Sequence, residues 1–196
     1  MGQENTGKSK HTAIKVIGAL LLIAAAAFII WFKWFGGRDA LVGSQIDQQF
    51  DCGDFMIKME STMRPEAQDK LDEQSKKLTE TYKNPTTYYE YSNHDNGVVF
   101  DAEIIQAKDS LSKEQQQKLI DSGKKSFKQF ANYKEISSDD NRLSFTADIG
   151  GQTQYCLVVF KTKGSKFYRF DFTCKTNYRD DYESRFDKWA DSITLV

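Results

Sequence analysis

The stretch YCLVVFKTKGSKFYRFDFTC, residues 155–174, predicts two antiparallel strands joined by a tight turn at its KGSK segment. If this turn centres on Ser165, three pairs of side chains face each other across the hairpin and share one buried face. These pairs are Phe160 with Phe170, Val158 with Phe172, and Cys156 with Cys174. Lys161, Arg169 and Asp171 would then point away from that face. A turn one residue shorter would break the pairing.

The facing cysteines of this hairpin are candidates for a covalent bond. In an oxidising compartment, Cys156 and Cys174 could form a cross-strand disulfide if their Cα atoms lie within about 7 Å. The alternative is two buried thiols that pack as small apolar groups. Cys52 lies near the first expected strand and could pair with either of them. Because the chain has three cysteines, one thiol per monomer stays unpaired unless two chains cross-link.

Upstream of the hairpin, strand and helix patterns follow one another. Residues 54–60 alternate buried and exposed side chains, which predicts a half-buried strand. Residues 65–82 predict a helix that has Pro65 at its first position and a narrow apolar face. That face consists of Ala67, Leu71, Leu78 and Tyr82. Residues 86–108 predict a second hairpin, which turns at the DNG segment.

Two further helices are predicted, one before and one after the C-terminal strands. These strands are separated by the turn signals SSDDNR, IGGQ and KGSK. Ser112 and Gln115 form a capping box at the start of the first helix. Gly123 in the middle of this helix costs about 1 kcal/mol relative to alanine. Either a close approach to the sheet compensates for this cost, or the glycine sits on the surface by chance. The last helix begins with Asp180 and Asp181, which suit the helix dipole. Its core stripe is Tyr182, Phe186, Trp189 and Ile193.

The last hairpin and the aromatic helix YRDDYESRFDKWADSITLV, residues 178–196, resemble the PsbP/Mog1-like group, which includes bacterial envelope proteins of the DcrB type. The resemblance covers about residues 97–196. It implies an α+β fold in which helices flank an antiparallel β-sheet as an α/β/α sandwich, and it implies a binding or assembly role without a shared catalytic motif. A cystatin-like or NTF2-like arrangement is the alternative fold.

Residues 14–35 predict a transmembrane signal-anchor helix. Between Lys15 and Lys33 lie seventeen uncharged residues, which span roughly 26 Å as a helix, close to the thickness of a hydrocarbon core. A cleavable signal peptide is the alternative, but a bulky apolar run at 28–32 follows the small residues at 24–27, so we expect the helix to be retained. The lysines that precede the span place the N-terminus in the cytoplasm.

This orientation divides the chain into four parts. We expect residues 1–13 to form a cytoplasmic tail, 14–35 the anchor, 36–50 a linker, and 51–196 an extracytoplasmic domain at the cell membrane. Four basic residues and one acidic residue lie in the first thirty-five positions, so the remainder carries about four net negative charges. Because phosphate backbones require a basic surface, nucleic acid is not an expected partner.

Few patterns in the sequence carry chemistry. The cysteines lack paired metal-ligand spacing, and neither a phosphate-binding glycine loop nor a nucleophile elbow is present, so we expect no metal, no cofactor and no enzyme activity. His94 lies in a polar turn next to Asp95. A general base is conceivable there, but an exposed turn histidine without a catalytic role is the simpler interpretation.

A tyrosine cluster offers a better candidate binding surface. On a strand, Tyr89 and Tyr91 share one face and Tyr88 takes the other. Tyrosine buries a large area at low entropic cost and keeps a polar group, which favours it in binding surfaces. We therefore predict that Tyr88, Tyr89 and Tyr91 contact a ligand or partner. The alternative is that one of the two faces lines the core.

Two hypotheses for function follow from these patterns. In the first, the protein is a membrane-anchored binding or assembly module of the cell envelope, with an envelope protein as its partner and a small ligand as a further possibility. In the second, it is an extracytoplasmic enzyme or stress factor that uses Cys52 or His94. A structural domain of a larger membrane complex is a third alternative.

Overall fold

The computed structural model describes residues 47–196, so the expected tail, the anchor and most of the linker lie outside the described residues. Within residues 47–196, no helix is long and apolar enough to cross a membrane. The described chain begins in a strand, β1 (Asp47–Asp51). Residues 47–50 therefore belong to the folded domain, which corrects the end of the linker predicted over 36–50.

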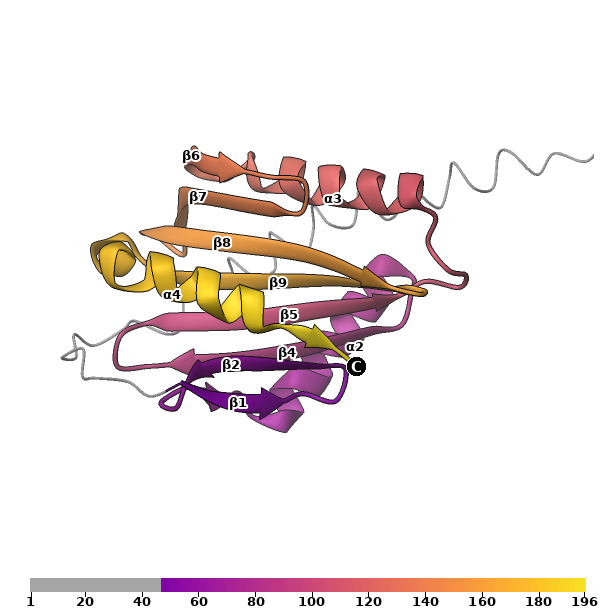
Figure 1. The fold of residues 1–196 in the computed structure, drawn as a ribbon, viewed down its shortest axis with the longest axis horizontal. Coiled ribbons are helices and arrows are strands. Elements are labelled where there is room, and N and C mark those ends of the chain that lie inside the picture. The colour runs from indigo at the N-terminus through magenta and orange to yellow at the C-terminus, as the bar shows by residue number, and fades with distance from the viewer. Residues whose placement is uncertain (1–46) are drawn as a thin grey trace, which may run out of the picture.

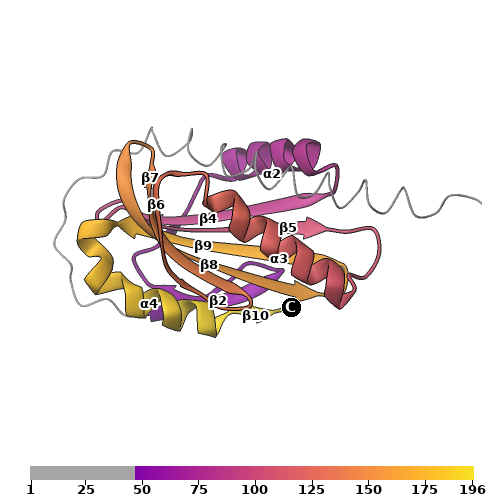
Figure 2. The same ribbon diagram turned by 90° about the horizontal axis from the view of Figure 1, so that it is seen from above.

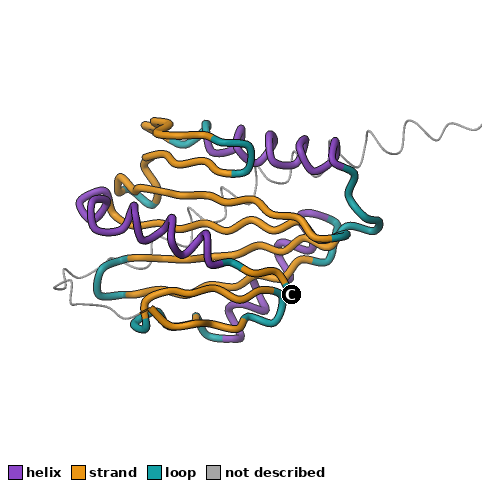
Figure 3. Tube along the Cα trace, viewed as in Figure 1, coloured by secondary structure: helices purple, strands orange, loops and turns teal. Residues whose placement is uncertain are grey.

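Two antiparallel sheets organise the described chain (Figure 1 and Figure 3). The larger sheet has seven strands in the order β3-β4-β5-β9-β8-β7-β6, and the smaller has three in the order β1-β2-β10. The large sheet consists of β3 (Arg64–Pro65), β4 (Thr86–Asn93), β5 (Val98–Gln106), β9 (Lys166–Lys175), β8 (Gln152–Lys163), β7 (Arg142–Ile149) and β6 (Ala131–Ser138). The small sheet adds β2 (Phe55–Glu60) and β10 (Thr194–Leu195) to β1.

Three α-helices and one 3₁₀ helix cover the large sheet. They are α2 (Gln68–Tyr82), α3 (Lys113–Phe127), η1 (Thr176–Tyr178) and α4 (Arg179–Ser192). Figure 2 shows α2 and α4 on opposite sides of the sheet. We call the two sides the α4 face, which the small sheet also covers, and the α2/α3 face. The prediction of an α+β fold with helices flanking an antiparallel sheet is confirmed.

Each face of the large sheet has its own apolar core. On the α4 face, Tyr182, Phe186 and Trp189 of the last helix pack on the sheet, as the predicted stripe required. On the α2/α3 face, the two other helices contribute a second set of buried apolar residues. This set includes Leu71 and Leu78 of α2, Leu119 and Phe127 of α3, and Phe145 and Phe160 of the sheet. Each buried large side chain stabilises the fold by about 1.5–3 kcal/mol.

Both helices on the α2/α3 face have the expected caps and faces, with one correction. The Ser112 and Gln115 capping box is present at the start of α3. Helix α2 begins at Gln68, later than predicted, because Pro65 pairs with Tyr91 in the short strand β3 and Ala67 is still extended. Proline is favoured in the first turn of a helix, but here Pro65 pairs with β4 and the helix begins after it.

Gly123 lies against the sheet, as the first of the two interpretations predicted. A Cβ atom at this position would stand 2.8 Å and 2.9 Å from two ring carbons of Phe160. Phe160 is itself buried and its ring stacks on Phe167, with 5.9 Å between the ring centroids. The ring has little room to move, so α3 depends on glycine to approach β8 this closely.

The hairpin of β8 and β9 differs from the predicted register by one residue. Lys163 pairs with Lys166, so the loop has two residues, Gly164 and Ser165. Gly164 adopts a φ of 61°, and a first loop residue with positive φ is a feature of the tight turns that match strand twist. Because side chains alternate along a strand, the shift moves the side chains of one strand to the other face of the sheet relative to its partner.

The predicted pairing of the two cysteines is consequently wrong. Cys156 pairs with Thr173 and points to the α2/α3 face, whereas Cys174 pairs with Tyr155 and points to the α4 face. Both thiols are free, as is that of Cys52. Two side chains on opposite faces of one sheet cannot reach each other, which removes the candidate disulfide between Cys156 and Cys174.

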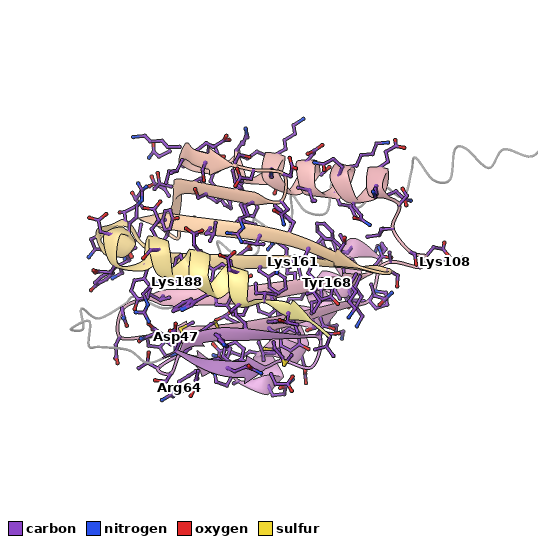
Figure 4. All side chains as sticks on the ribbon, viewed as in Figure 1. Asp47, Arg64, Lys108, Lys161, Tyr168 and Lys188 are labelled. Carbon is purple, nitrogen blue, oxygen red and sulfur yellow. The ribbon has the colours of Figure 1, made fainter. Side chains whose placement is uncertain are left out.

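The same shift corrects the expected exposure of the hairpin's charged residues. Arg169 and Asp171 are buried on the α2/α3 face instead of pointing to solvent. Lys161 lies opposite Tyr168 on the α4 face (Figure 4), where its Nζ donates a hydrogen bond of 2.8 Å to the carbonyl of Ile193. Lys161 and Arg169 were expected on one side of the sheet and lie on two.

We expect all three cysteines of the purified chain to be free. Unfolding the full chain with an alkylating agent and without a reductant should give a mass increase for three modified thiols. Mass spectrometry after expression in an oxidising compartment provides the measurement. A mass increase for one thiol, with a peptide that links Cys156 to Cys174, would contradict the register described above.

Gly123→Ala should destabilise the fold by about 1–2 kcal/mol, because the clash with the Phe160 ring outweighs the gain in helix propensity. Urea denaturation followed by near-ultraviolet circular dichroism measures the change, with Lys125→Ala on the exposed side of α3 as the control. Adding Phe160→Leu to Gly123→Ala should recover part of the loss, giving a non-additive double-mutant cycle. A Gly123→Ala chain as stable as the unmodified one would refute the close-approach interpretation.

Candidate functional site

A row of acidic side chains crosses the α2/α3 face of the large sheet. Glu90 of β4 pairs with Asp101 of β5, and Asp101 pairs with Asp171 of β9. Directly paired residues on neighbouring strands place their Cβ atoms about 4.5–5.5 Å apart. Glu90, Asp101 and Asp171 therefore form one continuous line of carboxyl groups, which we call the carboxylate row. All three are buried, at 1–3% exposure.

Arg169 provides the positive charge next to this row. Its Nη2 donates to Glu103 Oε1 at 2.7 Å, and its Nε donates to Asp171 Oδ2 at 2.9 Å. The hydroxyl of Tyr82, on α2, donates to the other oxygen of Glu103 at 2.7 Å. The Phe127 ring of α3 lies 5.7 Å from the guanidinium carbon. Both helices of this face thus touch the same ion pair.

Several polar atoms of the row lack hydrogen-bond partners within the part of the chain that the structure describes. These atoms are Glu90 Oε1, Asp101 Oδ1 and Oδ2, Asp171 Oδ1 and Arg169 Nη1, and the neighbouring Thr173 and Gln154 add three more. A buried polar atom without a partner costs about 1–3 kcal/mol. Because native proteins leave few such atoms, this cluster is a candidate position for a bound water, ion or ligand.

The charges of the row are unbalanced, and its pKa values shift accordingly. Burial raises the pKa of Asp101 well above its usual range, and the nearby Asp171 raises it further. Burial also raises the pKa of Asp171 to about 6, although Arg169 opposes the shift. The pKa of Glu90 rises to about 8 by burial, in spite of the hydrogen bond from Tyr88. Near neutral pH, protons therefore offset part of the negative charge.

A pocket of about 250 Å³ opens beside this row, between α2 and β4. Its walls come from Glu66, Lys70, Leu71, Glu73, Gln74 and Lys77 on the helix side, and from Tyr88 and Glu90 on the strand side. On the helix side, Lys70 pairs with Glu66 at 3.1 Å and Lys77 pairs with Glu73 at 2.6 Å. On the inner wall, the Tyr88 hydroxyl donates to Glu90 Oε2 at 2.7 Å. The pocket thus ends at the first carboxyl of the row.

The three tyrosines predicted to bind lie on two faces, as their alternation required. Tyr88 lines the pocket. Tyr89 and Tyr91 are half-buried on the α4 face, where the small sheet covers them. Tyr89 donates to Asp54 Oδ2 at 3.2 Å, and the Tyr91 hydroxyl lies 3.5 Å from the sulfur of Cys52. The structure therefore joins Tyr88 to the candidate site and separates the other two from it.

The two residues proposed for catalysis make separate contacts. Cys52 is buried next to Tyr91, and burial raises the pKa of its thiol, which disfavours the reactive thiolate. His94 Nε2 lies 3.2 Å from Ser92 Oγ. Because Ser92 and Tyr91 are consecutive on β4, these contacts lie on opposite faces of the sheet. Over residues 47–196, no three His, Cys, Asp or Glu side chains converge on a metal position.

Sequence reasoning missed the carboxylate row and its arginine. A signal was present in the sequence, because β5 reads VVFDAEIIQ and β9 reads KFYRFDFTCK. In each strand, two charged residues stand two positions apart within an otherwise apolar run, so both point to the same face. The β5 pair consists of two acidic residues, and the β9 pair consists of an arginine and an aspartate. Charged residues of both signs on the same face of two adjacent strands indicate a buried ion pair.

Comparisons with known proteins bear on the fold. No model of a protein family matches the sequence, and no curated protein matches it. Among solved structures, the cyanobacterial PsbP of Synechocystis is 13% identical with a TM-score of 0.47, and the match covers 82% of this chain and 99% of that one. The Ran-binding protein Mog1p of Saccharomyces cerevisiae is 8% identical with a TM-score of 0.46, covering 78% and 97%.

A third similar structure is LpqN of Mycobacterium tuberculosis, described as involved in cell envelope biogenesis. It is 8% identical with a TM-score of 0.46, and the match covers 82% of this chain and 99% of LpqN. A PsbP protein and a Mog1 protein, whose families the segment 97–196 resembles, are thus both among the similar structures. With TM-scores of 0.47 or less, these matches supply no argument about ligand, partner or activity.

The raised pKa of Glu90 predicts how stability depends on pH. The folded chain holds this proton more tightly than the unfolded chain does, so the contribution of Glu90 is fully present below its ordinary pKa of 4.5 and is lost as the pH rises through about 8. Each proton involved changes the free energy of unfolding by at most about 1.4 kcal/mol per pH unit. Glu90→Gln should remove this part of the dependence.

Urea denaturation of the full chain in detergent micelles, at a series of pH values between 5 and 8, measures the effect. The difference between the Glu90→Gln chain and the unmodified chain should grow toward higher pH, in favour of the variant. Glu73→Gln, on the outer wall of the same pocket, is the matched control and should leave the curve unchanged. Parallel curves for Glu90→Gln and the unmodified chain would show that Glu90 is already ionised in the folded state.

Proposed function

We propose that this protein is a single-pass, membrane-anchored binding module of the cell envelope, whose domain lies on the extracytoplasmic side and binds through the pocket between α2 and β4. The observation that carries the proposal is the inner wall of this pocket, where Glu90 is 1% exposed and its Oε1 lacks a partner among the described residues. A side chain in this condition favours a bound group that supplies the missing contact.

A gain in stability does not explain why the carboxylate row is buried. Replacing a buried ion pair by apolar side chains of similar volume is often neutral or stabilising. Here three carboxyl groups stand in line, and Arg169 makes hydrogen bonds with only one of them, Asp171. Local violations of packing rules of this kind are expected at functional sites. Their position at the end of an open pocket supports binding as the function.

The path of the chain is compatible with an anchor at the N-terminus. Residues 14–35 have the length and charge distribution of a transmembrane helix with a cytoplasmic N-terminus. The first described strand, β1, belongs to the small sheet on the α4 face. The pocket lies on the other face of the large sheet, so β1 leaves it open. A tethered domain of this design holds its ligand or partner close to the membrane surface.

The enzyme hypothesis has less support from the geometry. A catalytic Cys52 would need a lowered pKa and an adjacent base. Burial shifts its pKa upward instead, and its sulfur lies 3.5 Å from the Tyr91 hydroxyl. His94 contacts Ser92 on the opposite face. The binding module therefore accounts for more of the described residues.

The pocket's role can be tested by photocrosslinking in intact cells. A photoreactive amino acid replaces Gln74, which lines the pocket, and in a control chain it replaces Lys76, which is exposed on the same helix outside the lining. We expect a recurrent adduct from position 74, absent from position 76 and reduced when residues 14–35 are deleted. Mass spectrometry of the adduct distinguishes a protein from a small molecule. Identical adducts from both positions would argue against a binding site in this pocket.

A further inference from the structure

We propose that the pocket between α2 and β4 binds a small primary amine, whose ammonium group is received by Glu90 with Asp101 behind it. The inference rests on the proposed function, since it names the class of ligand for the same site. The unpartnered atoms of the carboxylate row determine which chemical group can complete the site.

The unpartnered atoms of the row are mainly acceptors. The row has four unpartnered carboxyl oxygens, from Glu90, Asp101 and Asp171, within the described part of the chain. The unpartnered donor groups beside them are Arg169 Nη1, Gln154 Nε2 and the Thr173 hydroxyl. An alkylammonium group brings three donors and no acceptor, so it suits this set. A carboxylate or phosphate ligand would add acceptors and negative charge to a site that already has an excess of both. An ammonium group therefore suits these acceptors better than an anionic group does.

The two lysines at the pocket do not reverse this charge. Lys70 pairs with Glu66 and Lys77 pairs with Glu73, so each positive charge has an acidic neighbour. Near neutral pH Glu90 holds a proton, so the lining of the pocket is close to neutral while the site is empty. Once this proton leaves, the ionised Glu90 gives the lining one formal negative charge, which balances the charge of an entering cation.

The arrangement fits an organic cation better than a metal ion. Calcium requires six to eight oxygens at about 2.3–2.6 Å around one point. The carboxyl groups instead follow a line across β4, β5 and β9, at the spacing of paired strands. In the described domain they do not converge on a metal position. A row of acceptors that begins at the pocket with Glu90 suits an amine better than a metal ion.

The pocket also provides an apolar wall for the carbon part of such a ligand. Leu71 of α2 and the ring of Tyr88 stand beside Glu90 in its lining. An aliphatic stem can pack on these side chains, and the aromatic face attracts the ammonium charge. A volume of about 250 Å³ is below the usual range for sites of drug-sized molecules, which favours a short amine.

Binding of this cation should release a proton. Near neutral pH the empty site holds its proton on Glu90, which faces the Tyr88 hydroxyl on its own strand, Asp101 on β5, and Glu66 with Lys70 beside α2. An ammonium group at Glu90 favours the carboxylate. The carboxyl proton therefore passes to the buffer when the amine enters, and the charge of the site is conserved in the exchange.

Isothermal titration calorimetry of the full chain in detergent micelles tests the proposal with three probes: methylammonium, cadaverine and benzylamine. Pentanediol, which has the chain of cadaverine without its charge, is the matched control ligand. At least one amine should bind to the unmodified chain near pH 7, and pentanediol should give no binding heat. Titrations in two buffers of different ionisation enthalpy should show that protons are released.

Two variants locate the site. Glu90→Gln should weaken binding of the amine by about tenfold or more, because it removes a charged hydrogen-bond acceptor. Glu73→Gln changes an acidic residue on the outer wall of the same pocket, and it should change the affinity by less than about twofold. Since Glu90→Gln is expected to be at least as stable as the unmodified chain, a loss of binding would not reflect unfolding.

Three results would overturn the inference. They are equal binding of pentanediol and cadaverine, an equal loss of affinity in Glu90→Gln and Glu73→Gln, and an absence of binding heat for all three amines up to about 10 mM, a concentration that covers even millimolar affinities. If the amines fail while a specific adduct still forms at position 74, the binding function stands and the ligand class is wrong. If the adduct at position 74 is also absent, the proposed function falls as well.

Discussion

The register of β8 against β9 is the constraint on which the rest of this structure depends. A loop of two residues, with Gly164 at a positive φ, sets which side chains of the two strands share a face. With this register, Phe170 and Phe172 complete the core under α4, while Arg169 and Asp171 lie beneath α2 and α3. One additional loop residue would exchange these sets relative to β8. The position of the acidic site is thus determined at a turn that does not line the pocket.

The charges buried by this register reduce the stability of the fold and give the α2/α3 face its chemistry. Aromatic packing on the α4 face, where Tyr182, Phe186 and Trp189 cover the sheet, provides stability without buried charge of this density. The α2/α3 face instead holds an arginine, a line of carboxyl groups and unpartnered oxygens next to an open pocket. The α4 face therefore mainly stabilises the fold, and the α2/α3 face carries the candidate binding site.

Much of the fold could be predicted from local signals, since those signals depend only on neighbouring residues. The capping box of Ser112 and the stripe of the last helix are of this kind. The register could not be predicted, because KGSK is compatible with loops of two or three residues, and this choice decides which side chains of β8 and β9 share a face. Arg169 was expected in solvent, where charged residues usually lie, since its partner Glu103 is on a distant segment of the chain. Of the three tyrosines expected to bind, only Tyr88 lines the site that the structure suggests.

The ion pair of Arg169 and Glu103 has a mechanical consequence for the two helices above it. Tyr82 of α2 bonds to Glu103, and the ring of Phe127 on α3 lies over Arg169. If either helix lifts from the sheet, water reaches the same buried charges, and the contact of the other helix weakens. Local opening of α2 and α3 is therefore cooperative, and the two helices act as one unit of the folding landscape. An event at the pocket beside α2 can in this way alter the backbone dynamics of α3, which lies on the same face of the sheet.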